Sequence, residues 1–195
     1  LGKLQEAEIS CRKAIELNPH YVIALANLGN ILRELGKLKE AELSYRKAIE
    51  MNPNFASAYW NLYGLANTIE EAEERINQCL KIDENYLDAT LTLSALKLHK
   101  GDQSLLDNLI KSTYKDHPIT RSIKWVSTLP KLPELFFHRW AIFDSMTEKS
   151  KKDRPFYEFG VWKGESFKYL IKTFKKGYGF DTFEGLPEKW GKNKQ

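Results

Sequence analysis

Apolar residues recur every three or four positions through the first 118 residues, the spacing that places them on one face of an α-helix. Turns rich in Gly, Pro, Asn and Asp interrupt this pattern at short intervals. The pattern predicts helices that pack as antiparallel pairs. They are expected at residues 3–17, 21–35, 37–51, 55–67, 69–82, 86–100 and 103–115.

The helical pattern is itself repeated. The segment GKLQEAEISCRKAIELNPHY, which begins at Gly2, returns as GKLKEAELSYRKAIEMNPNF at Gly36, a shift of 34 residues. This period and the residues at its fixed positions resemble the tetratricopeptide repeat, a helix-turn-helix unit. In the complete repeat from Val22, those positions hold Leu25, Leu28, Gly29, Leu32, Ala41, Tyr45, Ala48 and Pro53. Small residues allow helices to approach closely, and the proline ends the second helix.

The other repeats depart from this pattern in different ways. The first has lost its leading helix, and the third is three residues shorter, because Glu40-Ala41-Glu42 returns as Glu71-Ala72-Glu73. The fourth is degenerate and keeps only Leu93, Gly101, Leu106, Ile110 and Pro118 in register. We therefore assign residues 1–118 to about three and a half repeats, the first of them truncated, and expect a helical superhelix.

A polar residue recurs on the first helices of the repeats. Asn27 and Asn61 occupy equivalent positions, and Thr92 follows in the fourth repeat. An asparagine amide can donate to and accept from a peptide backbone, and stacked asparagines resemble the ladder in the repeats of O-linked N-acetylglucosamine transferase. The resemblance implies a peptide-binding groove with Asn27 and Asn61 on its concave side. The alternative is that these amides face solvent or cap contacts between helices.

The pattern changes after residue 118. Residues 119–133 contain Pro130 and Pro133 and are interpreted as a linker, with an apolar stretch around Trp125 that suits a short strand or a plug. A helical pattern returns from Glu134, and we assign residues 134–195 to a second domain.

The second domain contains a strand, a glycine turn, a helix and another strand. Strands are predicted at Phe156–Phe159 and Tyr178–Phe180, with a helix from Glu165 to Lys176 between them. A right-handed crossover makes the strands parallel, so the turn between Gly160 and Gly164 and the carboxylate of Asp181 share one edge. That edge binds nucleotide-like ligands in open α/β sheets.

The glycine spacing distinguishes among nucleotide-binding families. Trp162 stands where a dinucleotide fingerprint has its middle glycine, which argues against an oxidoreductase. The strings EFGVWKGES and YGFDTFEGLPEKW resemble class I S-adenosylmethionine-dependent methyltransferases, and within them the macrocin O-methyltransferase-like branch. The resemblance implies the incomplete opening β-α-β of a Rossmann-like methyltransferase domain. It also implies that Glu158, Gly160 and Gly164 line the methionine end of S-adenosylmethionine, and that Asp181 holds the ribose.

The function expected from these resemblances is methyl transfer to an oxygen or nitrogen nucleophile of a small molecule or saccharide. The chain starts in mid-motif and stops soon after the second strand, so we expect it to be an inactive piece of a longer enzyme. No catalytic residue is named, and any divalent metal of this branch is bound outside this piece. The alternative is a non-catalytic scaffold whose repeats bind a peptide or protein.

Composition and charge restrict the partners and the cellular location that we expect for the chain. Residues 149–195 hold 12 Lys and Arg against 6 Asp and Glu, but the lysines alternate with apolar residues, which favours a solvated face over a nucleic-acid site. Cys11 and Cys79 fall on core positions of the repeats, and the four histidines lack metal-ligand spacing. Without an apolar run long enough to span a bilayer or a signal peptide, we expect a cytoplasmic chain without a membrane partner.

Overall fold

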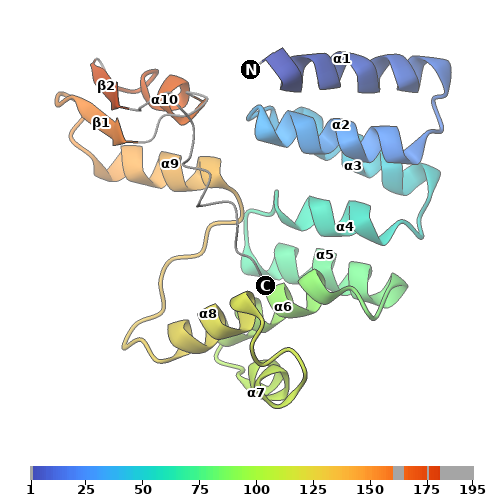
Figure 1. Cartoon of the computed structure of the whole chain (residues 1–195), viewed down its shortest axis with the longest axis vertical. Helices are drawn as coiled ribbons and strands as arrows, with labels where there is room; N and C mark the ends of the chain where they lie inside the picture. Colours follow the sequence, from blue (N-terminus) through green and yellow to red (C-terminus); the bar gives the residue numbers. More distant parts are fainter. Residues whose placement is uncertain (1, 160–164, 175, 181–195) are drawn as a thin grey trace, which may run out of the picture. The chain divides into compact units, whose positions relative to one another are not determined.

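The computed structural model describes residues 2–159, 165–174 and 176–180. The chain divides into two compact units, one spanning Gly2–His138 and the other beginning at Arg139 (Figure 1). Gly160, Gly164 and Asp181, three of the four residues predicted to bind the cofactor, lie outside the described residues.

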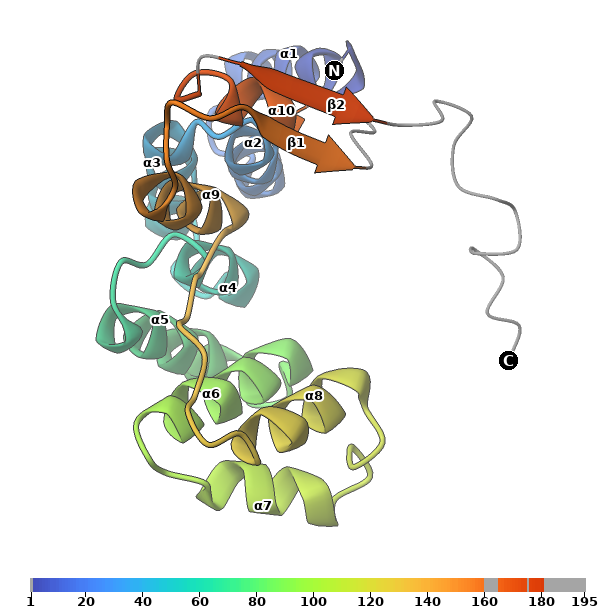
Figure 2. The same ribbon diagram turned by 90° about the vertical axis from the view of Figure 1, so that its left-hand side faces the viewer.

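The first unit is built of helices stacked in antiparallel pairs (Figures 1 and 2). α2 packs against α1 and α3, and α4 packs against α5, as expected of tetratricopeptide repeats. The predicted helices are confirmed, although α4 and α7 are shorter than the sequence pattern suggested. The helices are α1 Gly2–Leu17, α2 Val22–Glu34, α3 Leu38–Met51, α4 Ala56–Tyr63, α5 Ile69–Ile82, α6 Leu87–His99, α7 Ser104–Lys111 and α8 Pro118–Ser127.

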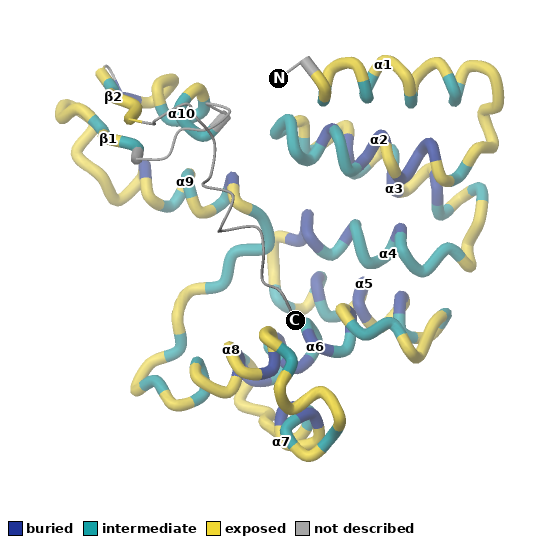
Figure 3. The backbone as a smooth tube through the Cα atoms, in the orientation of Figure 1, coloured by how far each residue is buried: buried dark blue, intermediate teal, exposed yellow. Residues whose placement is uncertain are grey.

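The core of the repeats follows the positions that recur in the sequence (Figure 3). Tyr45, Ala41 and Leu32 are fully buried in one cluster between α2 and α3. Gly29 lies against this cluster, since a Cβ added to it would come within 2.4 Å of Tyr45 Cε1. The glycine therefore makes room for the tyrosine ring of the neighbouring helix.

The cysteines behave as core residues, as the repeat alignment predicted. Cys79 is fully buried, and Cys11 is half-buried against the cluster of Tyr45. Burial raises the pKa of the Cys79 thiol to about 11, so little reactive thiolate forms near neutral pH.

The first turn of α5 is capped by the side chains of Thr68 and Glu71. Thr68 Oγ1 accepts a hydrogen bond from the Glu71 amide at 3.1 Å, and Glu71 Oε2 accepts one from the Asn67 amide at 2.8 Å. These two hydrogen bonds fix the start of α5 directly after the short turn that follows α4.

The range predicted as a linker, 119–133, contains helix α8 instead of a strand or plug. Pro118 occupies its first turn, where a proline is favourable because the missing N–H needs no helical partner. Ile123 packs against Leu98 and Leu106, so α8 belongs to the helical unit, which continues to His138. Pro130 and Pro133 follow the end of this helix, and residues 132–136 have no regular secondary structure.

The second unit contains α9 Arg139–Lys149, β1 Phe156–Phe159, α10 Glu165–Leu170 and β2 Gly177–Phe180. The strands pair in parallel, with Tyr157 opposite Tyr178 and Glu158 opposite Gly179, which confirms the predicted pairing. Helix α9 starts at Arg139 rather than Glu134, and α10 ends at Leu170, before the predicted Lys176. The described part of this unit is thus a small parallel β-α-β motif, which is common to many α/β folds.

Candidate functional site

The repeat surface carries the predicted asparagines. Asn27 on α2 is exposed and Asn61 on α4 is half-buried. Among the described residues, neither side-chain amide has a hydrogen-bond partner. By contrast, the side-chain oxygen Oδ1 of Asn30, one turn after Asn27, accepts a hydrogen bond from the Tyr45 hydroxyl at 2.7 Å. The two predicted amides are therefore not used to hold the fold together.

Thr92, which follows Asn27 and Asn61 in the series of equivalent positions, contacts another side chain of the protein. The Tyr63 hydroxyl lies beside the side chain of Thr92, and burial raises the pKa of Tyr63 above its usual value. Tyr63 also packs against Trp60, with their ring centroids 4.5 Å apart, and Trp60 lies 5.6 Å from Tyr86. This aromatic cluster ties α4 to α6 and occupies Thr92, so the series of unpaired polar side chains ends at Asn61.

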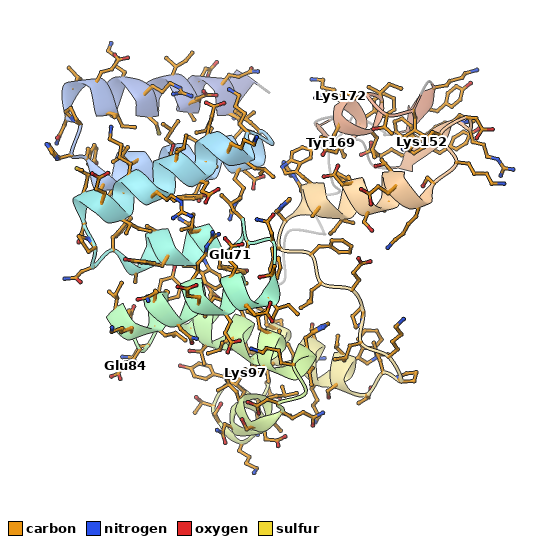
Figure 4. All side chains as sticks on the ribbon, turned by 180° about the vertical axis from the view of Figure 1, so that it is seen from behind. Glu71, Glu84, Lys97, Lys152, Tyr169 and Lys172 are labelled. Carbon is orange, nitrogen blue, oxygen red and sulfur yellow. The ribbon has the colours of Figure 1, made fainter. Side chains whose placement is uncertain are left out.

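A buried arginine stabilises the third repeat. Arg75 Nη1 donates to the carbonyl oxygen of Leu62 at 2.6 Å, near the end of α4. Its Nη2 pairs with Glu71, labelled in Figure 4, and lies 3.8 Å from Glu42 of α3. A hydrogen bond from the Asn67 amide, followed by Arg75, lowers the pKa of Glu71. This role of Arg75 was not predicted, because nothing in the sequence around Arg75 indicates a hydrogen bond to the carbonyl of Leu62.

Further ion pairs join successive repeats. Glu8 accepts from Arg12 and Lys37, and Glu73 pairs with Lys97 and Lys100. The Arg12 hydrogen bond lowers the pKa of Glu8, and the Lys100 hydrogen bond lowers that of Glu73. The Glu8–Arg12 pair lies within α1, whereas Lys37 joins Glu8 to the start of α3, and Lys97 and Lys100 join Glu73 of α5 to the end of α6.

In the second unit, Glu158 is the described member of the predicted cofactor site. Its Oε1 accepts a hydrogen bond from Ser166 Oγ of α10. Its Oε2 is buried, and no described residue donates a hydrogen bond to it. A buried carboxylate oxygen of this kind suits a cationic partner, because it needs both a donor and a compensating charge.

The two faces of the small sheet differ. Phe156 packs against Phe167 and Phe174, with ring centroids 5.1 and 5.3 Å apart, so α10 and the turn after it cover that face. On the other face, Tyr157 stacks against Tyr178, and both rings are substantially exposed.

A tyrosine and an aspartate join α9 to α10. The Tyr169 hydroxyl donates to Asp144 Oδ1 at 2.6 Å, and its ring lies 4.6 Å from that of Trp140. Burial raises the pKa of Tyr169 to about 12, and Lys172 Nζ lies 5.9 Å from its ring centroid (Figure 4). The pair was not predicted, and its neutral hydroxyl serves to hold two helices together.

The described residues contain no cluster of three or more His, Cys, Asp or Glu side chains able to hold a metal ion. Over the same residues, no helix is both long and apolar enough to cross a bilayer.

Comparisons with known proteins support the repeats. Residues 22–55 match the family profile of the tetratricopeptide repeat, and residues 1–21 match a second profile of the same repeat. No curated protein matches the chain.

Among solved structures that match the chain, one with a TM-score above 0.5 is also a tetratricopeptide repeat protein. A tetratricopeptide repeat protein from Parabacteroides merdae is 18% identical over 78% of this chain and 61% of its own, with a TM-score of 0.53. MamA is 18% identical over 88% of this chain and 87% of its own, with a TM-score of 0.48. An O-GlcNAc transferase from Thermobaculum terrenum is 17% identical over 95% of this chain and 39% of its own, with a TM-score of 0.46.

These findings confirm that the chain contains tetratricopeptide repeats, a module suited to binding peptides and proteins. They give no support to the methyltransferase resemblance of the second unit.

Proposed function

We propose that the repeats bind an extended peptide or a protein segment, through backbone hydrogen bonds to Asn27 and Asn61. One observation carries the proposal: these two amides stand at equivalent positions of α2 and α4 and have no hydrogen-bond partner among the described residues. An amide can donate to and accept from one peptide unit of a ligand at the same time. Because Thr92 lies beside the Tyr63 hydroxyl, this surface is limited to two such positions.

The test begins with peptides selected on the immobilised chain from a random display library. Each asparagine exchanges bonds to water for bonds to the peptide, so its net contribution is about 0.5–1.5 kcal/mol. The double variant Asn27→Ala/Asn61→Ala should therefore weaken binding of a selected peptide about tenfold, as measured by fluorescence anisotropy. The matched control is Asn54→Ala, an exposed asparagine in the turn before α4. Equal affinities of the wild type, the double variant and the control for the peptide would show that Asn27 and Asn61 do not bind it.

We propose as a second function that this chain is part of an S-adenosylmethionine-dependent methyltransferase, with the scaffold as the alternative. Support comes from Glu158, whose buried Oε2 lies on a strand paired in parallel with β2. A carboxylate oxygen there fits the cationic amino group at the methionine end of the cofactor. Bound S-adenosylmethionine would supply an electrophilic methyl group for an oxygen or nitrogen acceptor. Gly160 and Gly164 would line the same end, and Asp181 would hold the ribose.

Calorimetric titration with S-adenosylmethionine tests this proposal. We expect weak or no binding by the 195-residue chain, because a two-stranded parallel sheet gives a ligand little shelter. A longer protein that contains this sequence should bind it, and Glu158→Gln should weaken that binding tenfold or more, since hydrogen bonds to charged groups contribute about 1.5–3 kcal/mol.

The exposed Glu148 on α9 provides the matched control, Glu148→Gln. Asp181→Ala in the longer protein tests the ribose contact separately. A longer protein that does not bind the cofactor would leave the scaffold as the function.

A further inference from the structure

The segment after α8 has no helix or strand, yet it packs against the repeats as a bound peptide would. We call residues 131–138 the strap. Figure 2 shows the chain leaving α8 and running past α6 toward the end of α4. Leu132 packs on the cluster of Leu98, Leu106 and Ile123. Farther along, Leu135 and Phe137 pack on the cluster that contains Ala66 and Ile76.

The surface under the strap exists because the third repeat is short. Its first helix, α4, has 8 residues, whereas α2 has 13. The turn that follows α4 places Leu65 and Ala66 in the core, and they are only 8% and 3% exposed with the strap in place. The strap passes close to this turn, since a Cβ added to Gly64 would lie 3.7 Å from the carbonyl oxygen of Phe137.

The strap has the chemistry of a peptide ligand. Its side chains at positions 132, 135 and 137 are apolar and half-buried against helices, whereas Lys131 and Glu134 are exposed. Pro130 and Pro133 restrict the backbone, which reduces the entropy lost when the segment is ordered. Apolar anchors on a restricted, non-helical backbone are also what a separate peptide would present.

We propose that the surface at the end of α4, around Gly64, Ala66 and Ile69, is a second peptide-binding surface, and that the strap is its internal occupant. A separate peptide with the same apolar spacing, Leu-x-x-Leu-x-Phe, binds there when the strap leaves. The proposal does not depend on the asparagine side chains, although Asn61 lies one turn before Gly64.

The strap should compete strongly because it is tethered. A short tether gives an effective concentration of about 1 mM. A free peptide whose intrinsic dissociation constant is roughly 100 µM would therefore bind the intact chain about tenfold more weakly than a chain with its strap released.

The probe is a fluorescent peptide with the sequence of residues 130–138, PKLPELFFH. It is titrated into the wild-type chain and into Leu135→Ser/Phe137→Ser, in which the strap has lost both anchors at the end of α4. We expect the variant to bind the peptide about tenfold more tightly than the wild type. Lys131→Ser, at an exposed strap position, should behave like the wild type, and a scrambled peptide should not bind either protein.

A variant that keeps its helical circular dichroism but binds the peptide no more tightly than the wild type would overturn the proposal. If the double variant unfolds, Phe137→Ala replaces it, with hydrogen exchange as the measurement. Added peptide should then slow exchange of the amides of Leu65 and Ala66, and unchanged exchange would overturn the proposal as well. Asn27→Ala/Asn61→Ala combined with the strap variant should still bind this peptide, so the two binding proposals fail independently.

Discussion

Replacing Arg75 by alanine should lower the free energy of unfolding by about 3 kcal/mol, measured by urea denaturation followed by circular dichroism. The side chain is nearly buried and donates to the Leu62 carbonyl while pairing with Glu71 and Glu42. The carbonyls at the end of a helix lack intrahelical donors, so the arginine acts as a cap for α4. Its removal also exposes apolar surface that its stem covers.

The matched control is Arg46→Ala. Arg46 forms an ion pair with Glu42 at 2.7 Å, four residues away on α3, but its side chain is 57% exposed. An exposed pair of this kind contributes only about 0.3–0.5 kcal/mol. A loss for Arg75→Ala no larger than for Arg46→Ala would show that α4 does not depend on the buried arginine.

The helices of the repeats could be predicted because one pattern recurs at a fixed distance. Ala41 recurs as Ala7 and Ala72, and Pro53 recurs as Pro19, so further copies identify these helices and their ends. The helices that were predicted wrongly lie where the repeat pattern is broken. α4 is short because the third repeat lacks three residues, and α8 was missed because Pro118 was interpreted as a stop when it occupies a helix's first turn.

The candidate sites could be predicted only in part. Asn27 and Asn61 follow from the period, and Glu158 follows from its motif. Three contacts could not be predicted: that of Tyr63 with Thr92, the hydrogen bond from Arg75 to Leu62, and the packing of the strap. Each is a contact between elements whose relative positions are set by packing, and no local spacing in the sequence encodes it.

Replacing Gly29 by leucine should lower the free energy of unfolding by about 3 kcal/mol or more, again measured by urea denaturation. A glycine-to-alanine change within a helix would by itself be favourable by about 1 kcal/mol. Here the first added carbon lies 2.4 Å from Tyr45 Cε1, and the ring is fully buried, so neither group has space to move. The control is Asn27→Leu, at an exposed position of the same helix, which should change stability by less than about 0.5 kcal/mol.

The third repeat shows how the clash can be relieved. In the third repeat, Tyr63 is equivalent to Gly29 and Ile76 is equivalent to Tyr45. There the large residue is on the first helix and the smaller one is on the second. Gly29→Leu combined with Tyr45→Ile should therefore cost about 1–2 kcal/mol less than the sum of the single changes, since residues in contact are coupled. Strict additivity in this double-mutant cycle would show that Gly29 is not required by the tyrosine ring, and that some other neighbour of α2 excludes a side chain there.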